Sequence, residues 1–105
     1  MVSNTYYLYI LYSSNSDKYY VGYSTDPIRR VDEHNNKPFT TYTAKHRPWK
    51  LIAYFNCGNE EKTAIKIERF IKKQKSQKLI LLLCDPSFSP RGILAQLVRV
   101  PDIRD

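Results

Sequence analysis

The chain has 105 residues, a formal net charge of +7 and two cysteines, Cys57 and Cys84, which predicts one domain with free thiols and excludes a disulfide-rich scaffold. The longest apolar run, residues 79–84, is too short to span a bilayer, and we see no signal segment, so we expect a cytoplasmic protein without membrane contact. The excess positive charge lies before Cys84, where 14 Lys/Arg face 7 Asp/Glu, and favours either a polyanionic partner such as nucleic acid or a solvated surface.

The N-terminal third predicts a β-hairpin followed by a helix. Residues 6–12 and 18–23 are rich in tyrosine and aliphatic residues and flank a turn cluster at 13–17. Alternation places Tyr7, Tyr9 and Leu11 on one face of the first strand. Asp26 and Pro27 are typical of a helix start, so we expect a helix to about Asn35 with Asp26 as its cap.

The middle of the chain predicts one more strand and two more helices. A polar, basic connection, residues 36–48, leads into a strand at 49–55 that begins with Trp49, which we expect in the core. Asn59 is the expected cap of a helix that runs to about Lys75 and buries Ala64, Ile67 and Ile71. Ser76 is the expected cap of a short helix over 77–83.

The last residues differ in composition from the rest of the chain. Residues 85–105 contain three prolines and one amphipathic piece, 93–100, and predict an appended tail, loosely ordered or packed on the surface. Residues 95–100 also resemble peptides encoded where a reading frame runs into a transfer-RNA gene, which would make the tail removable. We therefore expect a domain over residues 1–83 and a tail over 84–105. The fold class is α+β, with a three-stranded antiparallel sheet packed by about three helices.

The order of motifs resembles a known nuclease superfamily. Six of the nine tyrosines lie in the first hairpin, and a tyrosine-rich sheet alone would explain that crowding. The YLY at residues 7–9 and the YVG at residues 20–22, however, resemble the paired signature of the GIY-YIG superfamily. Arg30, His34 and Glu68 follow at the expected spacing. The resemblance covers residues 6–83 and is to small stand-alone bacterial members, which are similar to the catalytic domains of excision-repair and resolvase nucleases.

The resemblance implies a role for each residue of this set. Tyr9 would act as general base or position the attacking water, with its pKa lowered by the charge of Arg30. Tyr20 would hold water or phosphate, and Gly22 would allow backbone or substrate to approach closely. Arg30 would clamp the phosphate oxygens. A surface ion pair between Arg30 and Glu68 is the structural alternative.

Two further roles are implied by the resemblance. Glu68 would be the protein carboxylate on Mg²⁺ or Mn²⁺, and the metal would stabilise the leaving 3′ oxygen. His34 would relay a proton or contact phosphate, although a solvated helix histidine is the alternative. Basic side chains would follow the phosphate backbone or belong to a solvated face; the candidates are Lys45, Arg47, Lys72 and Lys73.

The sequence departs from the superfamily pattern at two points. The first signature glycine is replaced by Tyr7, as in many small members. The asparagine that larger relatives carry near the domain end has no clear match here. Neither departure removes a residue of the candidate site.

The chain is therefore expected to be a divalent-metal-dependent endonuclease that cuts phosphodiester bonds in DNA. The resemblance implies branched or nicked DNA as the substrate and DNA repair or recombination as the setting. A non-catalytic nucleic-acid-binding module is the first alternative. A nuclease subunit activated by a protein partner, or active as a homodimer, is the second.

Overall fold

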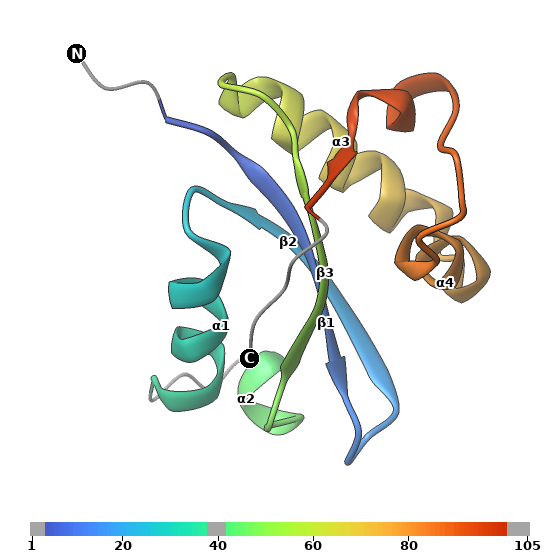
Figure 1. Ribbon diagram of the computed structural model, residues 1–105. Coiled ribbons are helices and arrows are strands. Elements are labelled where there is room, and N and C mark those ends of the chain that lie inside the picture. The colour runs from blue at the N-terminus through green and yellow to red at the C-terminus, as the bar shows by residue number, and fades with distance from the viewer. Residues whose placement is uncertain (1–3, 38–41, 101–105) are drawn as a thin grey trace.

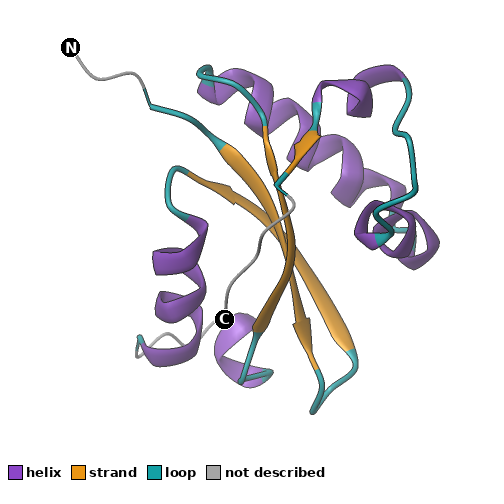
Figure 2. Ribbon diagram, in the orientation of Figure 1, coloured by secondary structure: helices purple, strands orange, loops and turns teal. Residues whose placement is uncertain are grey.

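The computed structural model describes residues 4–37 and 42–100. These residues form one antiparallel sheet with helices on both faces (Figures 1 and 2). Its four strands have the spatial order β2-β1-β3-β4; they are β1 (Tyr7–Ser13), β2 (Lys18–Ser24), β3 (Lys50–Asn56) and β4 (Val98–Arg99). No helix of the described residues is long and apolar enough to cross a membrane.

Two pairs of helices cover the two faces of the sheet. Helices α1 (Pro27–Asn36) and α2 (Tyr42–Lys45) lie on one side, and α3 (Glu61–Gln74) and α4 (Gln77–Cys84) lie on the other (Figure 1). A short 3₁₀ helix, η1 (Gly92–Gln96), precedes β4. The α+β antiparallel class expected from the sequence is confirmed, with one more short strand than the three that were predicted.

Strand alternation divides the core between these faces. Leu8 and Ile10 of β1 pack with the buried residues of α3 and α4. Tyr9 and Leu11 point the other way and pack with Trp49 and with Val31 of α1. Trp49 is 4% exposed, so its expected place in the core is confirmed.

Local signals in the sequence placed most helix ends correctly. The Asp26 carboxylate accepts a hydrogen bond from the Arg29 amide at 3.1 Å, and the Ser76 hydroxyl accepts one from Leu79 at 3.1 Å. The expectation for Asn59 is wrong, because Glu60 occupies the N-cap of α3 and its side chain makes no capping bond. Ile28 on α1 is 51% exposed, although it is a large apolar residue.

The residues after Cys84 pack against the domain as far as they are described. Leu94 and Leu97 are 5% and 7% exposed and belong to the core on the α3 side. Val98 and Arg99 pair with Asn56 and Phe55 of β3. The guanidinium of Arg99 also donates to the carbonyl of Leu83 at 3.0 Å. This segment therefore extends the sheet, which composition alone did not indicate.

Candidate active site

Tyr9 lies directly over Gly22 on the neighbouring strand. The two residues are register partners in the β1–β2 ladder, so their side-chain positions share one face of the sheet. A Cβ atom on Gly22 would stand 2.5 Å from the Tyr9 hydroxyl oxygen and 2.6 Å from its Cζ. The space that the glycine leaves open is thus filled by the Tyr9 phenol itself.

The Tyr9 hydroxyl is hydrogen-bonded to a histidine from α1. Its oxygen lies 3.0 Å from Nε2 of His34, and the two side chains are 1% and 2% exposed. Within the described part of the chain, the other ring nitrogen of His34, Nδ1, is buried without a hydrogen-bond partner. The alternative of a solvated helix histidine is therefore wrong.

Burial keeps both groups uncharged at neutral pH. Burial, with a smaller contribution from the Arg30 charge, lowers the pKa of His34 to about 4. Burial also raises the pKa of Tyr9, assisted by the nearby Tyr20 phenol, and this effect exceeds the lowering by Arg30. Arg30 therefore lowers the pKa of Tyr9 as expected, but burial outweighs it, and the net pKa of Tyr9 lies above its usual value.

Arg30 lies at the mouth of the site. Its guanidinium acts electrostatically on the Tyr9 phenol and forms an ion pair with Glu33 at 3.0 Å. Its side chain is 37% exposed. A planar, half-exposed guanidinium in this position can bind an incoming phosphate in a bidentate manner.

Tyr20 completes the aromatic wall of the site. Its ring centroid lies 5.0 Å from that of His34, 6.4 Å from that of Tyr9 and 6.1 Å from that of Trp49. The Lys72 ammonium lies 5.1 Å from the Tyr20 ring centroid, within cation–π range. Tyr20 therefore connects the α1 side of the site with α3.

Glu68 brings the carboxylate to the site from α3. Its charge raises the pKa of Tyr9, so it acts on the same phenol as Arg30 does. Its Oε2 lies 3.7 Å from Nζ of Lys72, one helical turn away, and its side chain is 19% exposed. Arg30 forms an ion pair with Glu33, and Glu68 forms one with Lys72, so the Arg30–Glu68 pair considered as an alternative is not the arrangement found.

Glu68 can hold a hard divalent cation, although not within an all-protein cage. The described residues contain no group of three or more His, Cys, Asp or Glu side chains able to hold a metal. Magnesium commonly binds through one or two carboxylates, with water and substrate phosphate supplying the other oxygens. The Glu68 side chain is 19% exposed, so water and a substrate phosphate can reach its carboxylate. The donor set therefore fits such an ion.

The five predicted catalytic residues come from both faces of the sheet. Arg30 and His34 are on α1, and Glu68 is on α3, which lies on the opposite side (Figure 1). The two tyrosines come from β1 and β2, and β2 is an edge strand. The site is thus assembled around the β2 edge of the sheet, where side chains from both helices can meet.

The four predicted nucleic-acid-binding residues are not brought together. Lys72 lies in the site, and Lys73 is exposed on the same helix. Lys45 is exposed on α2, on the other side of the sheet. Arg47 donates hydrogen bonds to the carbonyl oxygens of His34, at 2.6 Å, and Lys37. Its guanidinium therefore binds the C-terminal end of α1.

One positioning residue was not predicted from the sequence. The Asn35 amide group donates to the Trp49 carbonyl at 2.9 Å and accepts from the Trp49 amide at 2.6 Å. This two-bond bridge fixes the end of α1, next to His34, against the start of β3. An asparagine near a helix end gives no signal of such a distant partner.

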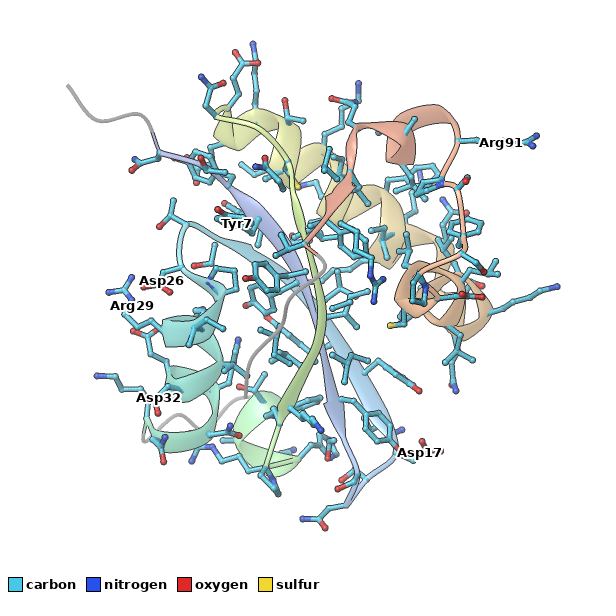
Figure 3. All side chains as sticks on the ribbon, viewed as in Figure 1. Tyr7, Asp17, Asp26, Arg29, Asp32 and Arg91 are labelled. Atoms are coloured by element: carbon cyan, nitrogen blue, oxygen red, sulfur yellow. The ribbon has the colours of Figure 1, made fainter. Side chains whose placement is uncertain are left out.

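The charged residues Asp26, Arg29 and Asp32 lie on the outer side of α1, away from the sheet (Figure 3).

The chain is similar in sequence to a known protein family and to several known proteins. The GIY-YIG catalytic domain family matches residues 5–80, which is more than half of the chain. A UPF0213 protein from Haloquadratum walsbyi is 35% identical over 81 residues, covering 74% of this chain and 89% of that protein. A UPF0213 protein from Listeria welshimeri is 38% identical over 71 residues, covering 68% and 77%.

A longer protein with a named activity also matches. The "Structure-specific endonuclease subunit SLX1" of Meyerozyma guilliermondii is 33% identical over 78 residues. The match covers 70% of this chain but 26% of that protein. The match therefore spans about a quarter of the longer protein, and most of that protein has no counterpart here.

Proposed function

The chain belongs to the GIY-YIG catalytic domain family, and we propose that it is a divalent-metal-dependent endonuclease that hydrolyses phosphodiester bonds in DNA. The observation that carries this proposal is the buried hydrogen bond between the Tyr9 hydroxyl and His34, together with the charges of Arg30 and Glu68, which both act on the Tyr9 phenol. A protein that only bound nucleic acid would need a basic surface, not a buried phenol–imidazole pair. The reaction class follows from these groups and from the family.

The Tyr9–His34 pair would move the proton of the attacking water. A tyrosine is already neutral at pH 7, and burial raises the pKa of Tyr9 further, so a free phenolate is a poor source of base. Neutral His34 can accept a proton through Nε2, 3.0 Å from the phenol oxygen. As the water attacks phosphorus, its proton passes to the Tyr9 oxygen while the Tyr9 proton passes to His34.

Arg30 and Tyr20 would position the phosphate. The guanidinium donates to the non-bridging oxygens and offsets the charge that develops on them. The Tyr20 hydroxyl donates to phosphate or holds the water. When bound at Glu68, Mg²⁺ or Mn²⁺ would act as a Lewis acid and stabilise the leaving 3′ oxygen. Glu68 itself would fix the cation by its carboxylate.

Substrate and setting are further parts of the proposal. The name of the Meyerozyma guilliermondii relative describes a structure-specific endonuclease subunit, which supports branched or nicked DNA as the substrate and repair or recombination as the setting. The word "subunit" likewise supports a protein partner that raises activity. The two free cysteines, one of them buried, support the reducing cytoplasm as its location.

A panel of labelled nucleic acids tests this function. Wild type would be incubated with single-stranded, duplex, nicked, flapped and four-way-junction DNA and with RNA, in Mg²⁺, Mn²⁺ or EDTA. The proposal predicts cutting of branched or nicked DNA in the presence of metal only. Cutting restored only by a cell extract would indicate a partner-activated subunit, and binding to every substrate without cutting would indicate a binding module.

A further inference from the structure

A groove runs along the edge strand β2 and opens beside the candidate active site. It has a volume of about 300 Å³ and lies between β2 and the corner where α3 meets α4. Tyr20 and Lys72 line this groove and also belong to the active site. A strand that enters the site can therefore continue into the groove without leaving the surface.

The charges around the groove favour an anionic ligand. Three lysines line it, namely Lys18, Lys72 and Lys75, against one carboxylate, Asp17. The Asp17 carboxylate accepts a hydrogen bond from the Tyr12 hydroxyl at 2.9 Å, which partly satisfies it. Figure 3 shows Asp17 near the tip of the β1–β2 hairpin, at the outer end of β2. Lys18 begins β2 and Lys75 is the C-cap of α3, so lysines line both walls.

The groove also has an apolar wall suited to a flat ring. Tyr19, Val21, Ile71 and Ile80 line it together with Tyr20. Bases stack on aromatic side chains, and phosphates are neutralised by lysine, in proteins that bind single strands. A space of about 300 Å³ has room for one base with its sugar, whereas a base pair within a duplex would not enter it.

We propose that this groove binds an unpaired nucleotide of the DNA strand next to the scissile phosphate. Lys18 and Lys75 contact its phosphates, and the base lies against the apolar wall. The inference rests on the proposed nuclease function and makes it more specific. In this proposal, the groove is the part of the chain that makes branched or flapped DNA the preferred substrate.

Binding measurements without metal test the groove separately from catalysis. The variant Lys18→Gln/Lys75→Gln removes the two lysines that belong to the groove alone. The matched control, Lys62→Gln/Lys66→Gln, changes the net charge equally at positions on α3 that do not line the groove. The probes are a fluorescent duplex that carries a single-stranded arm of about ten nucleotides and the same duplex without the arm.

The proposal predicts that the groove variant loses affinity for the armed duplex alone. The groove variant should bind the armed duplex about tenfold more weakly than the control variant does, and the plain duplex equally well. Equal losses on the two probes, or no difference from the control, would overturn the groove assignment. If wild type cuts no substrate, the nuclease proposal fails, while the binding comparison still decides whether the groove holds an unpaired strand.

Discussion

Tyr9 is the side chain on which the interactions of the site converge. Its hydroxyl lies 3.0 Å from Nε2 of His34 and is influenced by the charge of Arg30, while its ring occupies the space above Gly22. The resemblance of the sequence to a nuclease family predicted these residues as a set. It could not predict their electrostatics, because the rise in the pKa of Tyr9 depends on how deeply the folded chain buries it.

The contact between Gly22 and Tyr9 gives the first prediction. In Gly22→Ala the new methyl group would displace the phenol, so DNA cleavage should fall by about a hundredfold or more, because small misplacements at a reacting centre are costly. Overpacking should also lower the free energy of unfolding by about 1–3 kcal/mol. Cleavage assays and urea denaturation measure both effects.

A double mutant separates the clash from other effects of alanine. In a Tyr9→Ala background the ring is absent, so Gly22→Ala should cost much less stability than it does in the wild type. Equal costs in the two backgrounds would mean that Gly22 is needed for another reason.

The buried His34 gives a prediction about pH. Its pKa is about 4 in the folded chain and near 6.5 when unfolded, so the unfolded state binds more protons between these values. Stability is therefore complete above pH 6.5 and falls as the pH drops toward 4. Between about pH 7.5 and pH 5 the His34 contribution to the loss should be about 2 kcal/mol.

Urea denaturation of wild type and His34→Gln at these two pH values measures this contribution. The variant lacks the titrating ring, so its stability should change less over the same range. An equal pH dependence in both proteins would show that His34 is not held neutral by the fold.

At the level of elements, the sequence predicted what local signals encode. The hairpin, the capping of α1 by Asp26 and the buried face of α3 follow from residue type and period. Helix α2 was expected to be part of a polar connection, since a four-residue helix has too few residues to show a period. Strand β4 is stabilised by pairing with β3 and by burial of Leu94 and Leu97, and the amphipathic pattern of 93–100 did not reveal these long-range partners.

Because residues 85–100 pack against the core, we expect them to contribute to stability, unlike a removable tail. Leu94→Ala and Leu97→Ala should each lower the free energy of unfolding by about 2–4 kcal/mol, because each leaves a cavity in the core. Val98→Ala is the matched control, since this side chain is 65% exposed and should change stability by less than about 0.5 kcal/mol. Denaturant midpoints that are the same for all three variants would mean that the segment is dispensable for stability.

At the level of the whole molecule, the candidate site takes side chains from both faces of the sheet around one edge. Helix α1 supplies the histidine and arginine, α3 supplies the carboxylate, and edge strand β2 runs between them. Family resemblance predicted the five catalytic residues, but nothing in the sequence indicated the groove beside them. The groove depends on how α4 turns away from α3 at Lys75, which has a left-handed backbone with φ of 49°.

The uneven charge of the chain predicts that DNA binding is sensitive to salt. All of the net charge of +7 lies before Cys84, and each lysine or arginine that neutralises a phosphate releases counterions. Raising the salt from about 50 mM to about 200 mM should weaken binding about tenfold or more, as fluorescence anisotropy would show. Binding that is unchanged over this range would contradict a contact surface built on phosphates.

The most direct test of the central claim is cleavage of the best DNA substrate by wild type, Glu68→Gln and Glu60→Gln across a Mg²⁺ titration. Glu60 is an exposed carboxylate at the start of α3 and carries the same charge change away from the site. The account predicts that wild type and Glu60→Gln cut with the same dependence on Mg²⁺, and that Glu68→Gln loses at least about a hundredfold in rate. Cutting by Glu68→Gln at the wild-type rate, or wild-type cutting that persists in EDTA, would contradict the account.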